Sequence, residues 1–178
     1  VYFFMKSINC NGKLIDLSTP KVMGILNLTP DSFYDGGKYK SEREIIHQTE
    51  KILSEGATFI DIGAYSSRPG AQTISEEEEL SRILPILKTI IKTFPEVLIS
   101  IDTFRSNVAK QTLAIGACMI NDISAGNLDD EMFKIVTEFQ VPYCIMHMRG
   151  TPQNMQKKIV YDDLVKDILF YFSKKINE

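Results

Sequence analysis

The sequence is poor in the residues that define several common classes of protein. Among its 178 residues there are three cysteines, two histidines and no tryptophan. Three scattered cysteines do not make a disulfide framework and fit a reducing compartment, which we expect to be the cytoplasm. Cys118 and Cys144 lie in predicted strands, where each is expected to be a small buried residue. Two histidines support neither a zinc cluster of the usual spacing nor a Ser-His-Asp arrangement.

Long apolar runs and basic stripes are also missing. No apolar run reaches the length of a membrane span, and residues 1–4 lack the basic flank and cleavage pattern of a signal peptide. The net charge is −3, with no stripe of Lys and Arg. We therefore expect neither a membrane nor a nucleic acid as a partner. The acidic run Glu76–Glu79 is interpreted as the solvated first turn of a helix.

Short apolar runs alternate with amphipathic stretches along the chain. Strands are predicted near 21–27, 57–62, 97–101, 118–122 and 142–146. Helices are predicted near 42–55, 75–93, 105–115 and 129–139, with another beginning near 160. The strands are apolar nearly throughout, which is typical of parallel strands buried on both faces.

This order of elements predicts an α/β fold. With no hairpin signal, it fits either a doubly wound sheet or a (β/α)8 TIM barrel, and the lack of Gly-x-Gly-x-x-Gly after the first strand lowers the dinucleotide-binding alternative. A complete barrel takes about 250 residues. Residues 1–178 therefore have room for about the first five strand–helix units of a single barrel domain, incomplete at its C-terminus.

Local signals place the helix boundaries. Ser41 with Glu44, and Ser75 with Glu78, have the spacing of a capping box, which predicts that helices begin there. Pro85 lies inside the second predicted helix and is expected to kink or break it.

Polar side chains follow the predicted strands at the point where each strand ends. The residues are Asn27, Asp61, Asp102, Asn121 with Asp122, and His147. The carboxyl ends of parallel strands converge on one mouth of a barrel, so this repetition predicts an active site. His147 is open to two interpretations, a residue of the mouth or a structural histidine, whereas His47 is expected on an exposed helix face.

The types of these residues indicate a chemistry. Asp102 and Asn121 offer acceptors to a flat heterocycle that carries ring N–H and amino groups. Asn27 offers a neutral oxygen suited to Mg²⁺, which keeps most of its waters and binds substrate phosphates. Arg68, on the loop after the second strand, offers a fork suited to phosphate or carboxylate.

Four segments of the chain resemble the dihydropteroate synthases of the pterin-binding barrel superfamily. They are Met23–Gly37, Asp61–Gly70, Ser100–Thr103 and Ile120–Gly126, in the order and spacing of that family. The resemblance implies a transferase of folate biosynthesis, a target of sulfonamides. Such an enzyme joins 6-hydroxymethyl-7,8-dihydropterin pyrophosphate to p-aminobenzoate, gives 7,8-dihydropteroate and pyrophosphate, and uses Mg²⁺. A homodimer of the full-length protein is also implied.

The resemblance further implies roles for single residues. Asn27 would contact Mg²⁺, and Asp102 and Asn121 would bind the pterin, with Asp102 also favouring cationic character in the ring. The remaining candidates lie on two loops that close over the pyrophosphate and form the p-aminobenzoate pocket. They are Phe33, Asp35, Ser67, Arg68 and Pro69, of which Asp35 and Arg68 are predicted to be catalytic together with Asp102.

Departures from the family pattern keep other functions open. Ala64-Tyr65 and Ser67 replace a more usual Gly-Glu and Thr, and the family's later Asp, Lys and Arg-x-His segments do not occur in this chain. The isolated chain is therefore expected to be inactive. The alternatives are an inactive pterin-binding fragment and a sibling pterin-binding methyltransferase domain. The Asn-x-Thr-Pro-Asp-Ser-Phe loop counts against the methyltransferase, since a methyl donor carries no pyrophosphate.

Overall fold

A computed structural model describes residues 6–28, 38–66, 73–157 and 159–178. Its five-stranded sheet consists of β3 (Met23–Asn27), β4 (Phe59–Gly63), β5 (Leu98–Asp102), β6 (Met119–Asp122) and β7 (Tyr143–Ile145). Its α-helices are α2 (Lys38–Ser54), α3 (Glu76–Thr93), α4 (Ser106–Ile115), α5 (Met132–Phe139) and α6 (Leu164–Asn177). A short 3₁₀ turn, Met155–Lys157, precedes α6.

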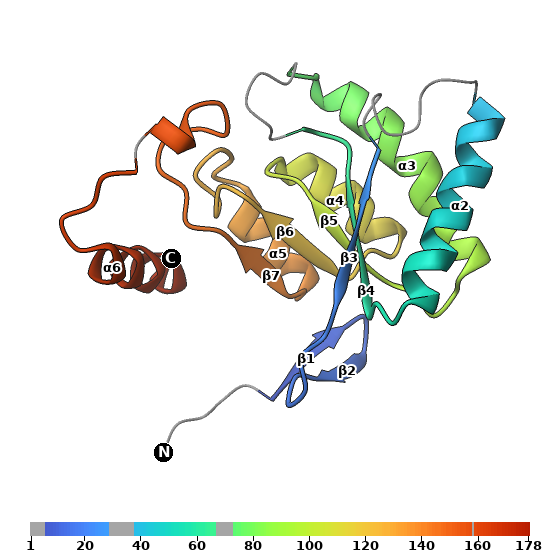
Figure 1. The fold of residues 1–178 in the computed structure, drawn as a ribbon, viewed down its shortest axis with the longest axis horizontal. Helices are drawn as coiled ribbons and strands as arrows, with labels where there is room; N and C mark the ends of the chain where they lie inside the picture. Colours follow the sequence, from blue (N-terminus) through green and yellow to red (C-terminus); the bar gives the residue numbers. More distant parts are fainter. Residues whose placement is uncertain (1–5, 29–37, 67–72, 158) are drawn as a thin grey trace.

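The strands of the large sheet are parallel and lie side by side in sequence order, from β3 to β7. A doubly wound sheet reverses its strand order at a switch point, whereas a barrel does not. Because right-handed crossovers between successive neighbours all fall on the same side, α2 to α5 cover one face of the sheet (Figure 1). The order therefore agrees with the barrel and excludes the doubly wound alternative.

The core lies between the sheet and these helices. Alternate strand residues face the helices, and they are almost completely buried: Leu26, Ile60, Ile62, Ile99, Ile101 and Ile120. Helix α3 meets them with Ile83, Leu87 and Ile90. Each such side chain contributes roughly 1.5–3 kcal/mol when it leaves water. This layer holds the carboxyl ends of the strands in fixed register.

A hairpin that the sequence analysis did not predict precedes the sheet. Strands β1 (Ser7–Cys10) and β2 (Lys13–Asp16) pair antiparallel around Asn11 and Gly12, whose φ angles are 50° and 83°. Two positive φ angles are those of a type I′ turn, for which Asn-Gly is the preferred pair. The expectation of no hairpin signal was therefore wrong.

The hairpin covers the amino ends of the strands (Figure 1). Cys10 packs there against Phe59, Cys118 and Met119, and all four residues are buried. The apolar cluster closes the end of the sheet opposite the polar strand ends. Cys118 is buried as expected, but Cys144 is exposed, because it lies on the sheet face that the helices do not cover.

One of the two expected helix starts needs correction. Helix α2 begins at Lys38, before Ser41. Ser75 caps α3, and its Oγ accepts from the backbone N–H of Glu78 at 3.2 Å. Helix α3 runs unbroken through Pro85, which lies on its exposed face, so the carbonyl that loses its helical partner can reach water.

Candidate active site

The strand register brings the predicted site residues into one row. Asn27 pairs with Gly63, Gly63 with Asp102, Asp102 with Asn121, and Asn121 with Cys144. Residues in register point to the same face of a parallel sheet. All five therefore face away from the helices, at the carboxyl ends of the strands. The predicted neighbours Asp102 and Asn121 lie on adjacent strands, as the sequence analysis expected.

Gly63 makes room between Asn27 and Asp102. A Cβ atom at this position would lie 3.1 Å from Asp102 Oδ2 and 3.2 Å from Asp102 Cβ. These distances are tighter than ordinary van der Waals contacts, so the Asp102 carboxyl uses the space that the missing side chain leaves. Strand β4, which lies between Asn27 and Asp102, therefore carries no side chain in this row.

The Asp102 carboxyl is strongly perturbed. Burial, and then the negative charges of Asp61, Glu79 and Asp122, raise its pKa from 3.8 to about 7. Near neutral pH this group therefore changes between a hydrogen-bond donor and an acceptor. Perturbed carboxyls of this kind concentrate at functional sites.

Asp61 lies one layer below this row and supports it. Its side chain is 4% exposed, and its Oδ2 accepts a hydrogen bond from Asn121 Nδ2 at 2.9 Å. In the described part of the chain, Asp61 Oδ1 and the neighbouring Ser100 Oγ have no hydrogen-bond partner. Both atoms lie one layer beneath Asp102 and Asn121.

Asp122 has a different role from its neighbour Asn121. It accepts from the backbone N–H groups of Ser124 (2.7 Å) and Gly126 (2.8 Å) and from the Tyr143 hydroxyl (2.6 Å). Burial and this bond to Asp122 raise the pKa of Tyr143 above its ordinary value of 10. Asp122 therefore shapes the loop after β6 and reaches the site only through its charge.

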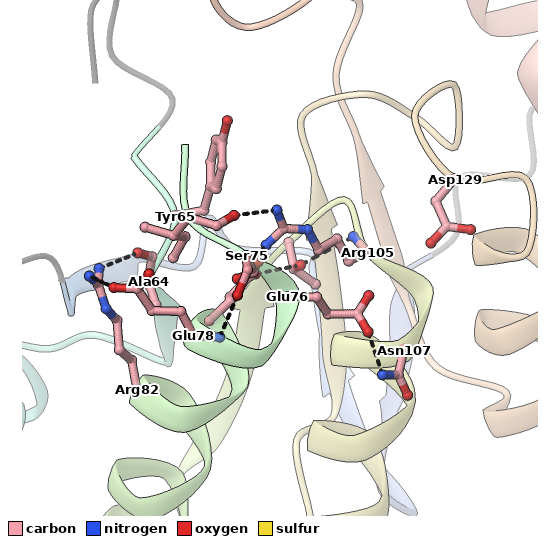
Figure 2. Close-up of polar contacts among 12 residues, drawn as sticks. Ala64, Tyr65, Ser75, Glu76, Glu78, Arg82, Arg105, Asn107 and Asp129 are labelled. Carbon is pink, nitrogen blue, oxygen red and sulfur yellow. Dashed lines mark hydrogen bonds and ion pairs between the residues drawn. The ribbon is translucent and has the colours of Figure 1, made fainter. Parts of the chain in front are cut away.

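A buried ion pair anchors the far end of the loop between β4 and α3. Arg105 binds Glu79 Oε2, and it also donates to the carbonyls of Ile74 (2.7 Å) and Ser75 (3.2 Å). Glu79 Oε1 accepts from Thr103 Oγ1 at 2.7 Å. Figure 2 shows Arg105 reaching from the start of α4 towards Ser75. The end of β5, the start of α4 and the start of α3 are thereby tied together.

The near end of the same loop is held by Arg82. Its guanidinium donates to the Ala64 carbonyl at 3.3 Å and pairs with Glu78 (Figure 2). The Arg105 guanidinium lies 5.4 Å from the centroid of the Tyr65 ring, within the range of a cation–π contact. Both described ends of the loop that carries the predicted residues 67–69 are therefore fixed by arginines.

The sequence analysis missed Glu79. It grouped Glu79 with a solvated acidic turn, yet the side chain of Glu79 is only 1% exposed. Burial raises its pKa above 4.5 even though Thr103 and Arg105 act in the opposite direction. The sequence did contain a signal for this burial. Helical spacing places Glu79 on the same face of α3 as the buried residues Ile83, Leu87 and Ile90.

The other candidates are five residues outside the described ranges, and Asn27, His147 and His47 within them. Phe33, Asp35, Ser67, Arg68 and Pro69 lie outside the described residues. Asn27 is exposed at the end of β3. His147 is partly buried, with its ring 4.7 Å from that of Tyr171 in α6 and 6.0 Å from that of Tyr161, so it packs in an aromatic cluster. His47 is exposed on α2, as expected.

The described ranges lack two broader features. Among those residues, no group of three or more His, Cys, Asp and Glu side chains could hold a metal ion. No helix within them is long and apolar enough to cross a membrane.

A parallel sheet with its strands in sequence order and polar residues at their carboxyl ends is typical of α/β barrel enzymes. Comparison with known families identifies the member of that class. A family model described as pterin binding enzyme matches residues 23–178, and the chain therefore belongs to that family.

Known relatives agree with this assignment. The chain is 51% identical to the folate synthesis bifunctional protein of Pisum sativum over 88% of its length, and it covers 31% of that protein. A Yersinia pestis dihydropteroate synthase, solved with a sulfonamide drug complex, superposes with a TM-score of 0.86 at 41% identity, over 96% of this chain and 62% of that one. A Xanthomonas albilineans dihydropteroate synthase with 4-aminobenzoic acid superposes with a TM-score of 0.84 at 34% identity, over 96% of this chain and 60% of that one.

The comparisons also fix the fold class. The described sheet and helices form part of a (β/α)8 barrel, with five of its strands in β3 to β7. The chain spans less than two thirds of the length of each of these three proteins.

Proposed function

We propose that this chain supplies the pterin-binding part of a dihydropteroate synthase. The enzyme would join 6-hydroxymethyl-7,8-dihydropterin pyrophosphate to p-aminobenzoate and release 7,8-dihydropteroate and pyrophosphate. The observation that carries the proposal is the pairing of Asp102 with Asn121 on the open face of the sheet. Two similar structures, one solved with a sulfonamide drug complex and one with 4-aminobenzoic acid, support the same chemistry.

The open face suits a ligand rich in hydrogen-bond donors. Asp102 in its ionised form and the Asn121 carboxamide oxygen accept hydrogen bonds, and a pterin presents ring N–H and amino donors in one plane.

The charge of Asp102 also suits the reaction. The bond from the pterin methylene to the pyrophosphate oxygen breaks, and both electrons leave with the pyrophosphate. The nitrogen lone pair of p-aminobenzoate then forms the new C–N bond, and that nitrogen loses a proton. A positive charge that develops on the methylene spreads into the ring, where an ionised Asp102 stabilises it in a site poor in water.

The Asn27 side chain is suited to bind the Mg²⁺ ion that the proposed reaction would use. Its carboxamide is exposed at the rim, and no cluster of acidic side chains competes for a cation in the described ranges. Mg²⁺ typically takes one or two protein oxygens and completes its shell with water and substrate phosphate. Bound there, Mg²⁺ would neutralise charge on the pyrophosphate.

The rest of the proposal concerns the loops and the assembly. Asp35, Ser67 and Arg68 would contact the pyrophosphate and the incoming amine, and Phe33 and Pro69 would line the p-aminobenzoate pocket. The protein would work as a homodimer in the cytoplasm and be inhibited by sulfonamides. The compartment is inferred from cysteine usage. The pea relative differs, because its name assigns it to mitochondria.

The test is turnover by the protein as its gene encodes it. Incubation with both substrates and Mg²⁺ should release pyrophosphate and dihydropteroate in equal amounts, and a sulfonamide should compete with p-aminobenzoate. Pterin binding without product, at saturating substrates, would contradict the proposal and favour the pterin-binding fragment. Methyl transfer from methyltetrahydrofolate to a corrinoid protein would favour the methyltransferase.

A further inference from the structure

The hydrogen bond between Asp61 and Asn121 joins two layers of the open sheet face. Asn121 lies in the row with Asp102, and Asp61 lies one layer deeper, on the strand beyond Asp102. The donor is the Asn121 amide and the acceptor is the Asp61 carboxylate, at 2.9 Å. Because Asp61 is 4% exposed, little solvent competes for this bond.

The chemistry of the pair fixes which end of the carboxamide points where. An ionised carboxylate only accepts hydrogen bonds, so the Asn121 atom next to it must be the nitrogen. The carboxamide oxygen must then point the other way. A flipped carboxamide would bring two acceptors together and leave the Asp61 oxygen unpaired in a buried position.

We propose that Asp61 is a positioning residue of the pterin site, which turns the oxygen of Asn121 towards the ring donors of the substrate. The inference rests on the proposed function for the identity of the ligand. Asp61 fixes the orientation of the Asn121 carboxamide through a hydrogen bond, and it acts on Asp102 through its negative charge. The site prefers a heterocycle that presents donors, because the Asn121 oxygen that is turned away from Asp61 can only accept hydrogen bonds.

The effect on Asp102 provides a second, independent signature. The carboxyls that raise its pKa are Asp61 on β4, Glu79 on α3 and Asp122 at the end of β6. Glu79 is paired with Arg105, and Asp122 accepts three hydrogen bonds, whereas Asp61 has one oxygen without a partner among the described residues. Removing the charge of Asp61 should therefore lower the pH at which Asp102 ionises.

Two variants and one control separate these effects. Asp61→Ala removes the acceptor, leaves the amide of Asn121 unpaired, and should raise the Kd for 6-hydroxymethylpterin by about tenfold in calorimetry. Asp61→Asn keeps the volume and removes the charge. It should move the midpoint of the pH dependence of binding down by about one unit, as expected for charges roughly 7–8 Å apart. Ser100→Ala, in the same layer, should change neither quantity.

A measurement without ligand keeps the inference testable if the Asp61 variants unfold. In the unliganded protein, the side-chain amide protons of Asn121 should show slow exchange and a hydrogen-bonded NMR shift, and Asn121→Ala should remove that signal. Rapid exchange would overturn the inference. So would folded Asp61 variants with the wild-type Kd and pH midpoint. If the wild-type protein binds no pterin while the amide is protected, the proposed function fails and the positioning geometry stands.

Discussion

The ion pair between Glu79 and Arg105 allows the sharpest prediction about stability. The Arg105→Ala substitution leaves the Glu79 carboxyl buried, with Thr103 as its remaining hydrogen-bond partner. Breaking a buried pair on one side typically costs about 3–5 kcal/mol. The Arg105 side chain is 18% exposed, so we expect the lower end, about 3 kcal/mol. For a domain of this size the melting temperature should fall by roughly 6–12 °C.

The same reasoning predicts how the loss depends on pH. Burial raises the pKa of Glu79 above 4.5 in the folded protein, and Arg105 opposes that rise. Without Arg105 the folded pKa rises further. A carboxyl whose pKa is raised on folding loses stability as the pH rises through the window above its unfolded value. The deficit of the variant should therefore be smallest below pH 4.5 and grow as the pH rises above that value.

Denaturant unfolding at several pH values, followed by circular dichroism, measures both quantities. Lys134→Ala is the matched control, because it breaks an ion pair with Glu131 that is exposed on both sides, and it should change stability little. The double variant Glu79→Leu with Arg105→Leu should recover most of the loss, since no charge stays buried. An Arg105→Ala variant as stable as the control, or a deficit independent of pH, would refute the reasoning.

Four further predictions concern the site itself. Asp102→Asn should lower kcat/KM by about 10²–10³-fold, because the charge that stabilises the cationic ring is lost. In the wild type, kcat/KM should rise with pH and reach half its maximum near pH 7, where the Asp102 pKa lies; a flat profile in steady-state assays would count against this. Gly63→Ala should weaken pterin binding by roughly tenfold with little loss of stability, since its Cβ would push on Asp102 at 3.1 Å; calorimetry and a melting curve test this, and unchanged affinity would show that Asp102 can move freely. Asn27→Ala should raise the Mg²⁺ concentration needed for half-maximal turnover while leaving the Kd for 6-hydroxymethylpterin unchanged, and an unaltered Mg²⁺ titration would remove Asn27 from the metal site.

The sequence predicted the elements whose signals are local and periodic. Continuous apolar runs indicated five parallel strands, and all five occur, with shifts of one or two residues at most ends. The expected burial on both faces was wrong for β3 and β7, where Ile25 and Cys144 are exposed. The sequence also predicted that the strand ends carrying Asp102 and Asn121 converge, and the strand register places these two residues side by side. The α/β class was therefore predictable from the sequence, whereas the roles of the site residues stay predictions.

The features that were missed depend on contacts distant in sequence. Glu79 is buried because Arg105, 26 residues later, supplies its counter-charge, and no local pattern shows that partner. The link from Asp61 to Asn121 spans 60 residues and requires the register of three strands. The hairpin is different, because Asn11-Gly12 is a local signal that was available and overlooked.

The most direct test of the central claim is binding of 6-hydroxymethylpterin to the isotope-labelled 178-residue chain, followed by NMR. The account predicts saturable shifts at Asp102 and at the side-chain amide of Asn121, and their loss in Asp102→Asn. Small, unsaturated shifts, or saturable shifts confined to residues far from the carboxyl ends of β5 and β6, would contradict a pterin site at this end of the sheet.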